Sequence, residues 1–200
     1  MENKQVRWWC SVALLCLGSG ARAQVSDLRE TARPPAGTVS AQELLHPPSR
    51  KAFQAFLAAQ KLSEKGSHEK AAEQLEKAVE LSPYFSDAWI NLAAQHLYLK
   101  RYELALQELA RASEIARPTA ILLSDMAFAQ YSLGRGAEGT RSAREALQLD
   151  PTYAPAHYLL GSFLARDRRT RAEGIAHLET AARDLPAVQE ELDRARAGGS

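Results

Sequence analysis

The sequence predicts an all-α protein built from repeated pairs of antiparallel helices. Three series of small residues recur along the chain with a period of 34, except that the last step of two series is 35. A period of this length, kept over four copies, indicates stacked supersecondary units. The series are Ala59, Ala93, Ala127 and Gly161; Ala71, Ala105, Gly139 and Gly174; and Ala78, Ala112, Ala146 and Ala181.

Small residues are needed where the two helices of a pair cross. A branched side chain at the crossing would push the helix axes beyond their usual separation of about 8–10 Å. Larger apolar residues recur at helical spacing between the small ones and are expected to fill the core beside each crossing. These residues are Leu75, Leu92, Leu109, Leu123, Leu160 and Leu178.

The order of residues within each copy resembles the tetratricopeptide repeat. In the second copy, Trp89, Leu92 and Ala93 are followed by Ala105, Leu109, Ala112 and Pro118, and the other copies keep a similar order. The resemblance covers roughly residues 50 to 186. It implies a right-handed superhelical solenoid of about four helix-turn-helix repeats, at residues 52–85, 86–119, 120–153 and 154–185, in a domain of residues 49–185.

Turn and cap residues predict where the helices end. Gly66 and Gly134 stand between the two helices of repeats one and three. A glycine adopts the left-handed backbone conformation that commonly ends a helix without a steric penalty. Lys100 and Arg168 stand at this place in repeats two and four, so those turns are expected to be less ideal. The expected N-caps are Ser86, Thr119 and Thr152, and Thr170 with Glu173 has the spacing of a capping box.

The first 23 residues are typical of a cleaved secretory signal peptide. Lys4 and Arg7 precede an apolar run, and the segment ends in Ala21-Arg22-Ala23. The apolar run is shorter than the roughly 20 residues of a membrane span, although an uncleaved N-terminal anchor is the rival interpretation. A lipid anchor is a further alternative, but Trp9 and Leu15, rather than small residues, precede Cys10 and Cys16. The sequence thus predicts an exported protein, periplasmic or extracellular, without stable membrane insertion after cleavage.

Two other segments lie outside the repeats. Residues 24–48 contain Pro34-Pro35 and Pro47-Pro48 and are expected to form a flexible leader. Ser40 and Glu43 have capping-box spacing, so one short helical turn that folds onto the repeats is the alternative. Residues 186–200 are expected to form a polar capping helix, to about Ala197, and a tail.

Charge and motifs exclude several classes of function. The chain has 25 basic and 24 acidic residues, and without residues 1–23 it has 22 and 23, which gives no reason to expect nucleic acid as a partner. The Arg166, Arg168, Arg169 and Arg171 cluster is interpreted as a solvated loop, with an anion or partner contact as the alternative.

No enzyme motif is found. The five histidines have no metal-site spacing, and His157, which replaces the Trp of repeat two, is expected to be packed or half-buried. Asp87, Asp125 and Asp150 are attributed to capping or solvation. A Gly-rich phosphate loop and a nucleophile motif are both absent from the sequence, so we expect neither enzyme activity nor a cofactor.

The resemblance also implies a concave groove, lined by the first helix of each repeat, that binds an extended peptide or a helix of a partner protein. Groove positions of the family fall on Leu97, Ser124 and Ser162, among other residues of this chain. Leu97, Tyr131 and Tyr158 are alternatively interpreted as contacts between adjacent repeats. The predicted partner-binding residues are Phe53, Phe56, Gln60, Ile90, Asn91, Ala94, Tyr98, Ile121, Phe128, Tyr131 and Tyr158.

One specialisation of the family is excluded. Members that clamp the C-terminal carboxylate of chaperones use Lys, Arg and Asn side chains at set groove positions. The matching residues here are Phe56, Gln60, Asn91, Ile121 and Asp125, and of these only Asn91 agrees. These positions therefore offer no cation to a carboxylate, and the clamp is absent.

The sequence thus predicts an exported protein-protein interaction scaffold. One alternative is an assembly factor for an envelope machine of secretion or pilus biogenesis. Another is a structural protein that self-associates when the groove takes the leader or terminal helix of a second copy.

Overall fold

The computed structural model describes residues 41–198 of the 200-residue chain, and within this range it contains helices but no strand. The predicted signal peptide and residues 24–40 of the predicted leader lie outside the described residues. The helices are α2 (Ala41–Leu45), α3 (Arg50–Glu64), α4 (His68–Leu81), α5 (Ser86–Tyr98), α6 (Tyr102–Ile115), α7 (Ala120–Ser132), α8 (Gly136–Leu149), α9 (Ala154–Leu164), α10 (Arg171–Asp184), the 3-10 helix η2 (Pro186–Val188) and α11 (Gln189–Ala197).

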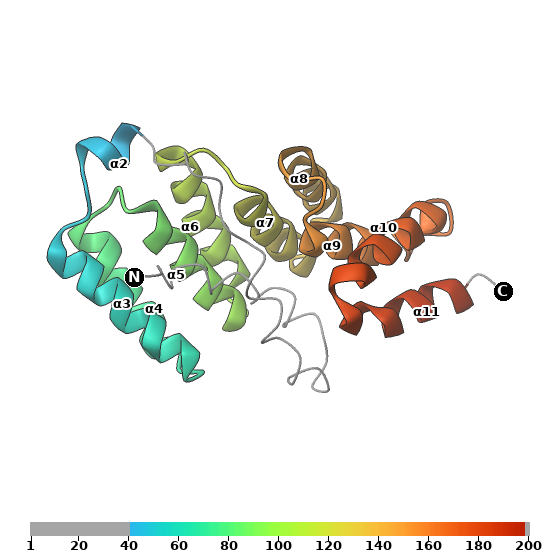
Figure 1. Ribbon diagram of the computed structural model, residues 1–200, viewed down its shortest axis with the longest axis horizontal. Coiled ribbons are helices and arrows are strands. Elements are labelled where there is room, and N and C mark those ends of the chain that lie inside the picture. The colour runs from blue at the N-terminus through green and yellow to red at the C-terminus, as the bar shows by residue number, and fades with distance from the viewer. Residues whose placement is uncertain (1–40, 199–200) are drawn as a thin grey trace. The chain divides into compact units, whose positions relative to one another are not determined.

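Consecutive helices pack as pairs, as the period of 34 predicts (Figure 1). The pairs are α3 with α4, α5 with α6, α7 with α8, and α9 with α10. We call α3, α5, α7 and α9 the first helices and α4, α6, α8 and α10 the second helices. The described residues fall into two compact units, 41–118 and 119–198.

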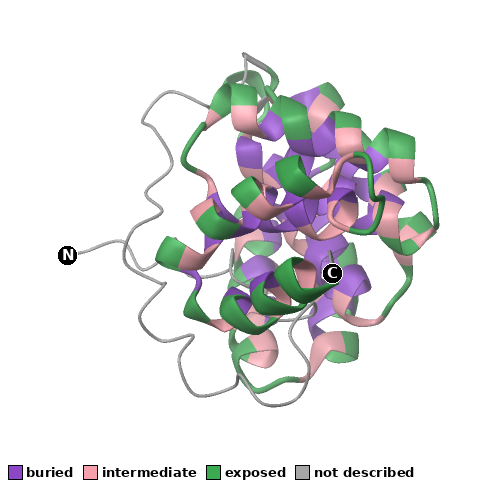
Figure 2. Cartoon of the chain, turned by 90° about the vertical axis from the view of Figure 1, so that its right-hand side faces the viewer, coloured by how far each residue is buried: buried purple, intermediate pink, exposed green. Residues whose placement is uncertain are grey.

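The small residues of all three series are buried, which confirms the prediction that they lie at helix contacts. Every alanine in the series is at most 1% exposed, and Gly139, Gly161 and Gly174 are buried as well. In Figure 2 the buried residues lie on helix faces turned toward neighbouring helices, and exposed residues lie on the outside. Leu75, Leu109, Leu160 and Leu178 are almost fully buried, so the predicted core residues fill the core.

Two glycines, Gly161 and Gly174, lie against each other where α9 packs on α10. A Cβ atom added to Gly174 would collide with the backbone nitrogen of Ala165 and would lie 2.9 Å from the carbonyl oxygen of Gly161. A Cβ on Gly161 would lie 2.9 Å from the backbone nitrogen of Leu178. Backbone atoms limit the space at both places, joined at Gly161 by the Leu178 side chain, so glycine is required at each.

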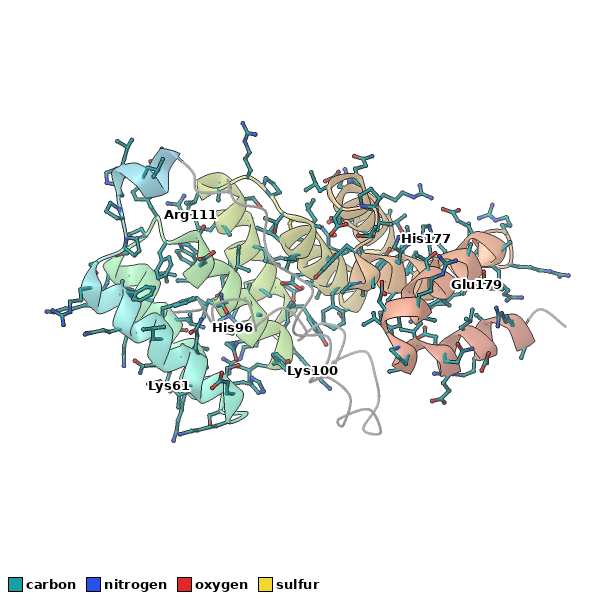
Figure 3. The ribbon with its side chains drawn as sticks, in the orientation of Figure 1. Lys61, His96, Lys100, Arg111, His177 and Glu179 are labelled. Atoms are coloured by element: carbon teal, nitrogen blue, oxygen red, sulfur yellow. The ribbon has the colours of Figure 1, made fainter. Side chains whose placement is uncertain are left out.

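Left-handed residues end three of the four first helices. Gly66 and Gly134 have φ angles of +72° and +76°, as predicted. Lys100 adopts φ +58° at the matching turn between α5 and α6 (Figure 3). The turn of repeat two therefore keeps its geometry without glycine. Repeat four instead uses a longer connection, residues 165–170, where the period lengthens by one residue.

Replacing Lys100 with glycine is expected to raise stability. A side chain in the left-handed region costs about 1 kcal/mol, and the exposed Lys100 side chain makes no described hydrogen bond that would be lost. The free energy of unfolding, measured in urea, should rise by up to about 1 kcal/mol in Lys100→Gly. The reverse change, Gly134→Ala, should lower it, because nothing lies within 4 Å of the new Cβ and only the backbone is strained. A less stable Lys100→Gly variant would contradict this interpretation.

Of the predicted N-caps, only Thr119 caps through its side chain, by accepting a hydrogen bond from the Leu122 amide at 3.2 Å. Ser86 is the first residue of α5 rather than its cap. The Thr152 amide and hydroxyl donate to the Asp150 carboxylate, so Thr152 stabilises the turn before α9. The capping box at Thr170 is not formed, because the Thr170 hydroxyl donates to the Leu164 carbonyl oxygen at 2.8 Å.

The segments that flank the repeats contain helices. Helix α2 lies within the predicted leader, as the alternative of one short helical turn predicts. The ring of His46, directly after α2, stacks on Tyr84 with ring centroids 4.8 Å apart. At the other end, Val188 and Leu192 are buried. Helix α11 packs on α10, which confirms the predicted C-terminal capping helix.

A polar pair bridges the two helices in repeats two and three. His96 of α5, labelled in Figure 3, lies 2.8 Å from Glu108 of α6. Both residues are buried. The Ser142 hydroxyl of α8 donates to Gln130 of α7 at 2.8 Å. Residues 96 and 130, and likewise 108 and 142, are one period of 34 apart. Burial raises the pKa of the Glu108 carboxyl, and its contact with His96 opposes that rise.

Candidate functional site

All the predicted partner-binding residues lie on the first helices. Helix α3 carries Phe53, Phe56 and Gln60, and α5 carries Ile90, Asn91, Ala94 and Tyr98. In the second unit, α7 carries Ile121, Phe128 and Tyr131, and α9 carries Tyr158. We call these two sets of side chains the first-helix faces of the units 41–118 and 119–198.

Two phenylalanines of α3 belong to the core of the unit 41–118. Phe56 is 4% exposed, and its ring centroid lies 5.0 Å from that of Phe85, which directly precedes α5. Phe53 is half-buried, with its centroid 6.4 Å from that of Phe85. Phe56 therefore joins the first repeat to the second, and its loss would damage the fold before any binding could be measured.

Helix α5 presents two half-buried polar residues. The Asn91 side-chain nitrogen donates to the Asp87 carbonyl oxygen at 2.7 Å. The Tyr98 ring stacks on His68 of α4, with ring centroids 4.2 Å apart, and His68 is hydrogen-bonded to Gln95 at 2.9 Å. Ile90 and Ala94 are buried, at 8% and 7% exposure. Asn91 and Tyr98 are thus the more accessible members of the set on α5.

In the unit 119–198, two predicted residues make contacts between elements. Tyr131 stacks on Phe163 of α9, with centroids 4.5 Å apart, and its hydroxyl donates to Thr140 of α8 at 3.2 Å. A Cβ on Gly139 would lie 2.6 Å from the Tyr131 ring, so this glycine makes room for it. Tyr158 is buried and its hydroxyl donates to Glu191 of α11 at 2.9 Å. These contacts are those expected from the alternative interpretation of both tyrosines as packing residues.

Phe128 is also buried, at 9% exposure, whereas Ile121 is half-buried in the first turn of α7. The residues with side chains left partly accessible on the two faces are therefore Phe53, Gln60, Asn91, Tyr98, Ile121 and Tyr131.

No protein-family model matches the chain. A stretch of 41 residues, 20% of the chain, is 51% identical to an uncharacterized protein of Methanocaldococcus jannaschii and covers 48% of it. The matched part thus spans about half the length of that relative.

Solved structures resemble the protein over most of its length. PilW, a type IV pilus biogenesis factor, matches with a TM-score of 0.66 and 22% identity, over 76% of this chain and 71% of that one. YrrB, a tetratricopeptide repeat protein with an unusual peptide-binding site, matches with a TM-score of 0.57 and 18% identity, over 68% of this chain and 69% of that one. The chain has the tetratricopeptide repeat fold.

The tetratricopeptide array leaves a few buried polar atoms without a hydrogen-bond partner, and among the described residues all of them are on first helices. Such atoms are uncommon in folded proteins because each retains the free-energy cost of its lost hydration. Each first helix carries one of them, and three of the four residues were predicted groove positions, Gln95 being the exception. The atoms are Gln60 Nε2 of α3, Gln95 Nε2 of α5, Ser124 Oγ of α7 and Ser162 Oγ of α9.

Asp125 of α7 is a further polar residue on a tetratricopeptide first helix, and its prediction as a capping or solvated residue is wrong. Its side chain is 6% exposed, and no hydrogen bond or ion pair to it is found among the described residues. Burial raises the pKa of its carboxyl to about 8, so the carboxyl is mostly protonated at neutral pH. Spacing alone could not reveal this, because an exposed Asp on a helix has the same sequence pattern.

The residues of the described range include no group of three or more His, Cys, Asp or Glu side chains that could hold a metal ion. Within the same range, no helix combines the length and apolar character that crossing a membrane requires.

Proposed function

We propose that the protein is a non-catalytic interaction scaffold that binds a peptide or helix of a partner protein on its first-helix faces. The observation that carries this proposal is the set of partly accessible side chains on the first helices, among them Phe53, Tyr98 and Ile121.

Similar folds support this proposal. YrrB is described by its peptide-binding site, which indicates that a helical array of this kind accommodates a peptide. The residues proposed to contact the partner are the partly accessible members of the predicted set, Phe53, Gln60, Asn91, Tyr98, Ile121 and Tyr131. Nucleic acid is not proposed as a partner, because basic and acidic residues are nearly equal in number.

Matched arginine substitutions test the binding face. Asn91→Arg and Ile121→Arg place charge on first helices, whereas Gln107→Arg and Gln148→Arg place it at exposed positions on second helices of the same units. A partner captured from the exported fraction and identified by mass spectrometry should bind the first-helix variants at least about ten-fold more weakly, a loss of 1.4 kcal/mol. The second-helix variants should bind like wild type. Equal losses in both sets would overturn the proposed face.

Export is the second part of the proposal, and it rests on the signal-peptide pattern of residues 1–23. The intact mass of native protein should correspond to a chain that begins at Gln24. A mass that includes Met1–Ala23, or a lipid on Cys16, would contradict export as a cleaved, unanchored protein.

Two narrower functions each have one observation in their favour. The similarity to PilW, a pilus biogenesis factor, favours an assembly factor for an envelope machine. Self-association is favoured by α2, where Leu44 and Leu45 are 71% and 73% exposed and could pack against a second copy. Sedimentation of the wild type and of a Leu44→Ser, Leu45→Ser variant separates the two. Only self-association predicts a wild-type oligomer that the variant loses.

A further inference from the structure

Two histidines of the fourth helix pair are hydrogen-bonded to each other. His157 of α9 and His177 of α10 have their Nδ1 atoms 2.8 Å apart and their ring centroids 5.0 Å apart. Both side chains are half-buried, and Figure 3 shows His177 on α10. Because two ring nitrogens can share only one proton between them, this contact depends on the protonation of both rings.

The tautomer of His157 is set by a backbone carbonyl. His157 Nε2 lies 3.0 Å from the Pro151 carbonyl oxygen, which can only accept, so Nε2 must carry a proton. The same bond occurs in repeat two, where Trp89 Nε1 donates to the Pro83 carbonyl oxygen at 2.9 Å. His157 stands where repeat two has Trp89 and reproduces its hydrogen bond to a proline six residues earlier.

It follows that His157 Nδ1 accepts and His177 Nδ1 donates when both rings are neutral. His177 is at the position that Glu108 and Ser142 occupy in the two preceding repeats. Glu108 and Ser142 are hydrogen-bonded to His96 and Gln130 of their own first helices. In repeat four, the apolar Leu164 stands at the position of His96 and Gln130 and offers no such partner. His177 therefore pairs with His157 instead.

The charged groups around the pair come from α8 and α10. Glu173 Oε1 of α10 lies 4.0 Å from His177 Nε2 and accepts a hydrogen bond from Arg144 of α8 at 2.9 Å. Burial is the main reason that the pKa of His177 is lowered. His157 and Arg144 lower it further, and Glu173 opposes them. Burial thus favours the neutral form of His177.

We propose that the His157–His177 pair is an acid-sensitive latch that holds α9 to α10 while at least one ring is neutral and opens when both rings are protonated. One added proton, on either ring, leaves a single proton between the two Nδ1 atoms and keeps the shared hydrogen bond. A second added proton places two N–H groups face to face, and two cations then repel each other across the contact.

The latch has a consequence for the C-terminal helix. Helix α11 packs on α10, and Tyr158 of α9 bonds to Glu191 of α11. Because α11 contacts both helices that the histidines join, separation of α9 from α10 also weakens the attachment of α11. Mild acid therefore loosens the end of the array first.

NMR spectroscopy of the imidazole nitrogens tests the geometry directly. At about pH 8, where unperturbed His is neutral, His157 should be the Nε2–H tautomer and His177 the Nδ1–H tautomer. On acidification, the two rings should titrate in two separate steps, the first of which keeps the shared hydrogen bond. His157 as the Nδ1–H tautomer, or two rings that titrate independently, would overturn the latch.

Amide hydrogen exchange tests the consequence. His177→Gln retains a donor for His157 Nδ1 and cannot titrate, so it is the matched control. Amide exchange in α9, α10 and α11 is compared between about pH 7.5 and pH 5 and corrected for its intrinsic pH dependence. In wild type it should accelerate about ten-fold for each unit by which folding lowers the pKa of the second protonation of the pair. His177→Gln should accelerate much less. Equal acceleration in both proteins would contradict the proposal, and if the variant does not fold, the NMR titration of wild type still decides it.

Discussion

A Gly174→Ala variant is expected to unfold at a much lower temperature than the wild-type protein. The added methyl group collides with the backbone of Ala165 and lies 2.9 Å from the Gly161 carbonyl oxygen, so α9 and α10 must move apart. Overpacking of this kind costs about 3 kcal/mol when the obstacle is backbone rather than a movable side chain. Thermal unfolding followed by circular dichroism measures the loss.

Gly198→Ala is the matched control for this variant. Its new Cβ meets only the Arg194 carbonyl oxygen at 3.5 Å, an ordinary contact distance, and its backbone has a φ of −70°. The control should lie within about 0.5 kcal/mol of wild type. Equal melting temperatures for Gly174→Ala and Gly198→Ala would show that α9 and α10 do not cross at Gly174.

The second large effect is expected from Asp125→Asn, and it depends on pH. The folded-state pKa of Asp125, about 8, lies above its ordinary value of 3.8, so the unfolded chain loses this proton at lower pH than the folded one. The Asp125 contribution to the free energy of unfolding is therefore fully present below about pH 4 and falls as pH rises toward 8. Each pKa unit corresponds to about 1.4 kcal/mol, so several kcal/mol are involved.

Asp125→Asn should therefore stabilise the protein at pH 8 much more than at pH 4, and should flatten this part of the pH profile. Urea unfolding across the pH range measures the difference. Asp184→Asn, at an exposed position on α10, is the control and should leave the slope unchanged. A wild-type slope retained in Asp125→Asn would mean that this carboxyl is not buried as described.

The fold followed from the sequence because the repeat supplies the same information four times. Ala71, Ala105, Gly139 and Gly174 each stand at one crossing, and a chance pattern would not keep this spacing. The exchange of alanine for glycine at positions 139 and 174 also has a local cause that the period does not reveal. Gly139 makes room for the Tyr131 ring, and Gly174 makes room for backbone.

The candidate site could be predicted less completely. The family pattern placed the chosen residues on the first helices, but it did not distinguish accessible side chains from those used in packing. Phe56 packs against Phe85, the residue directly before α5. Tyr158 is hydrogen-bonded to Glu191 of α11. Both contacts join residues about one repeat apart, which helical periodicity within one segment does not report. The sequence does not predict the His157–His177 contact, because the two histidines stand on different helices and share no spacing along a single helix.

Hydroxyl-radical footprinting of the protein, with and without its captured partner, directly tests binding on the first-helix faces. If the first-helix faces bind the partner, the half-buried Phe53, Tyr98 and Ile121 should lose reactivity in the complex. Leu104 and Leu149, which are 44% and 56% exposed on the second helices, should react equally in both states. Protection of Leu104 and Leu149, or of the loop at residues 165–170, with Phe53, Tyr98 and Ile121 unchanged, would contradict binding on the first-helix faces.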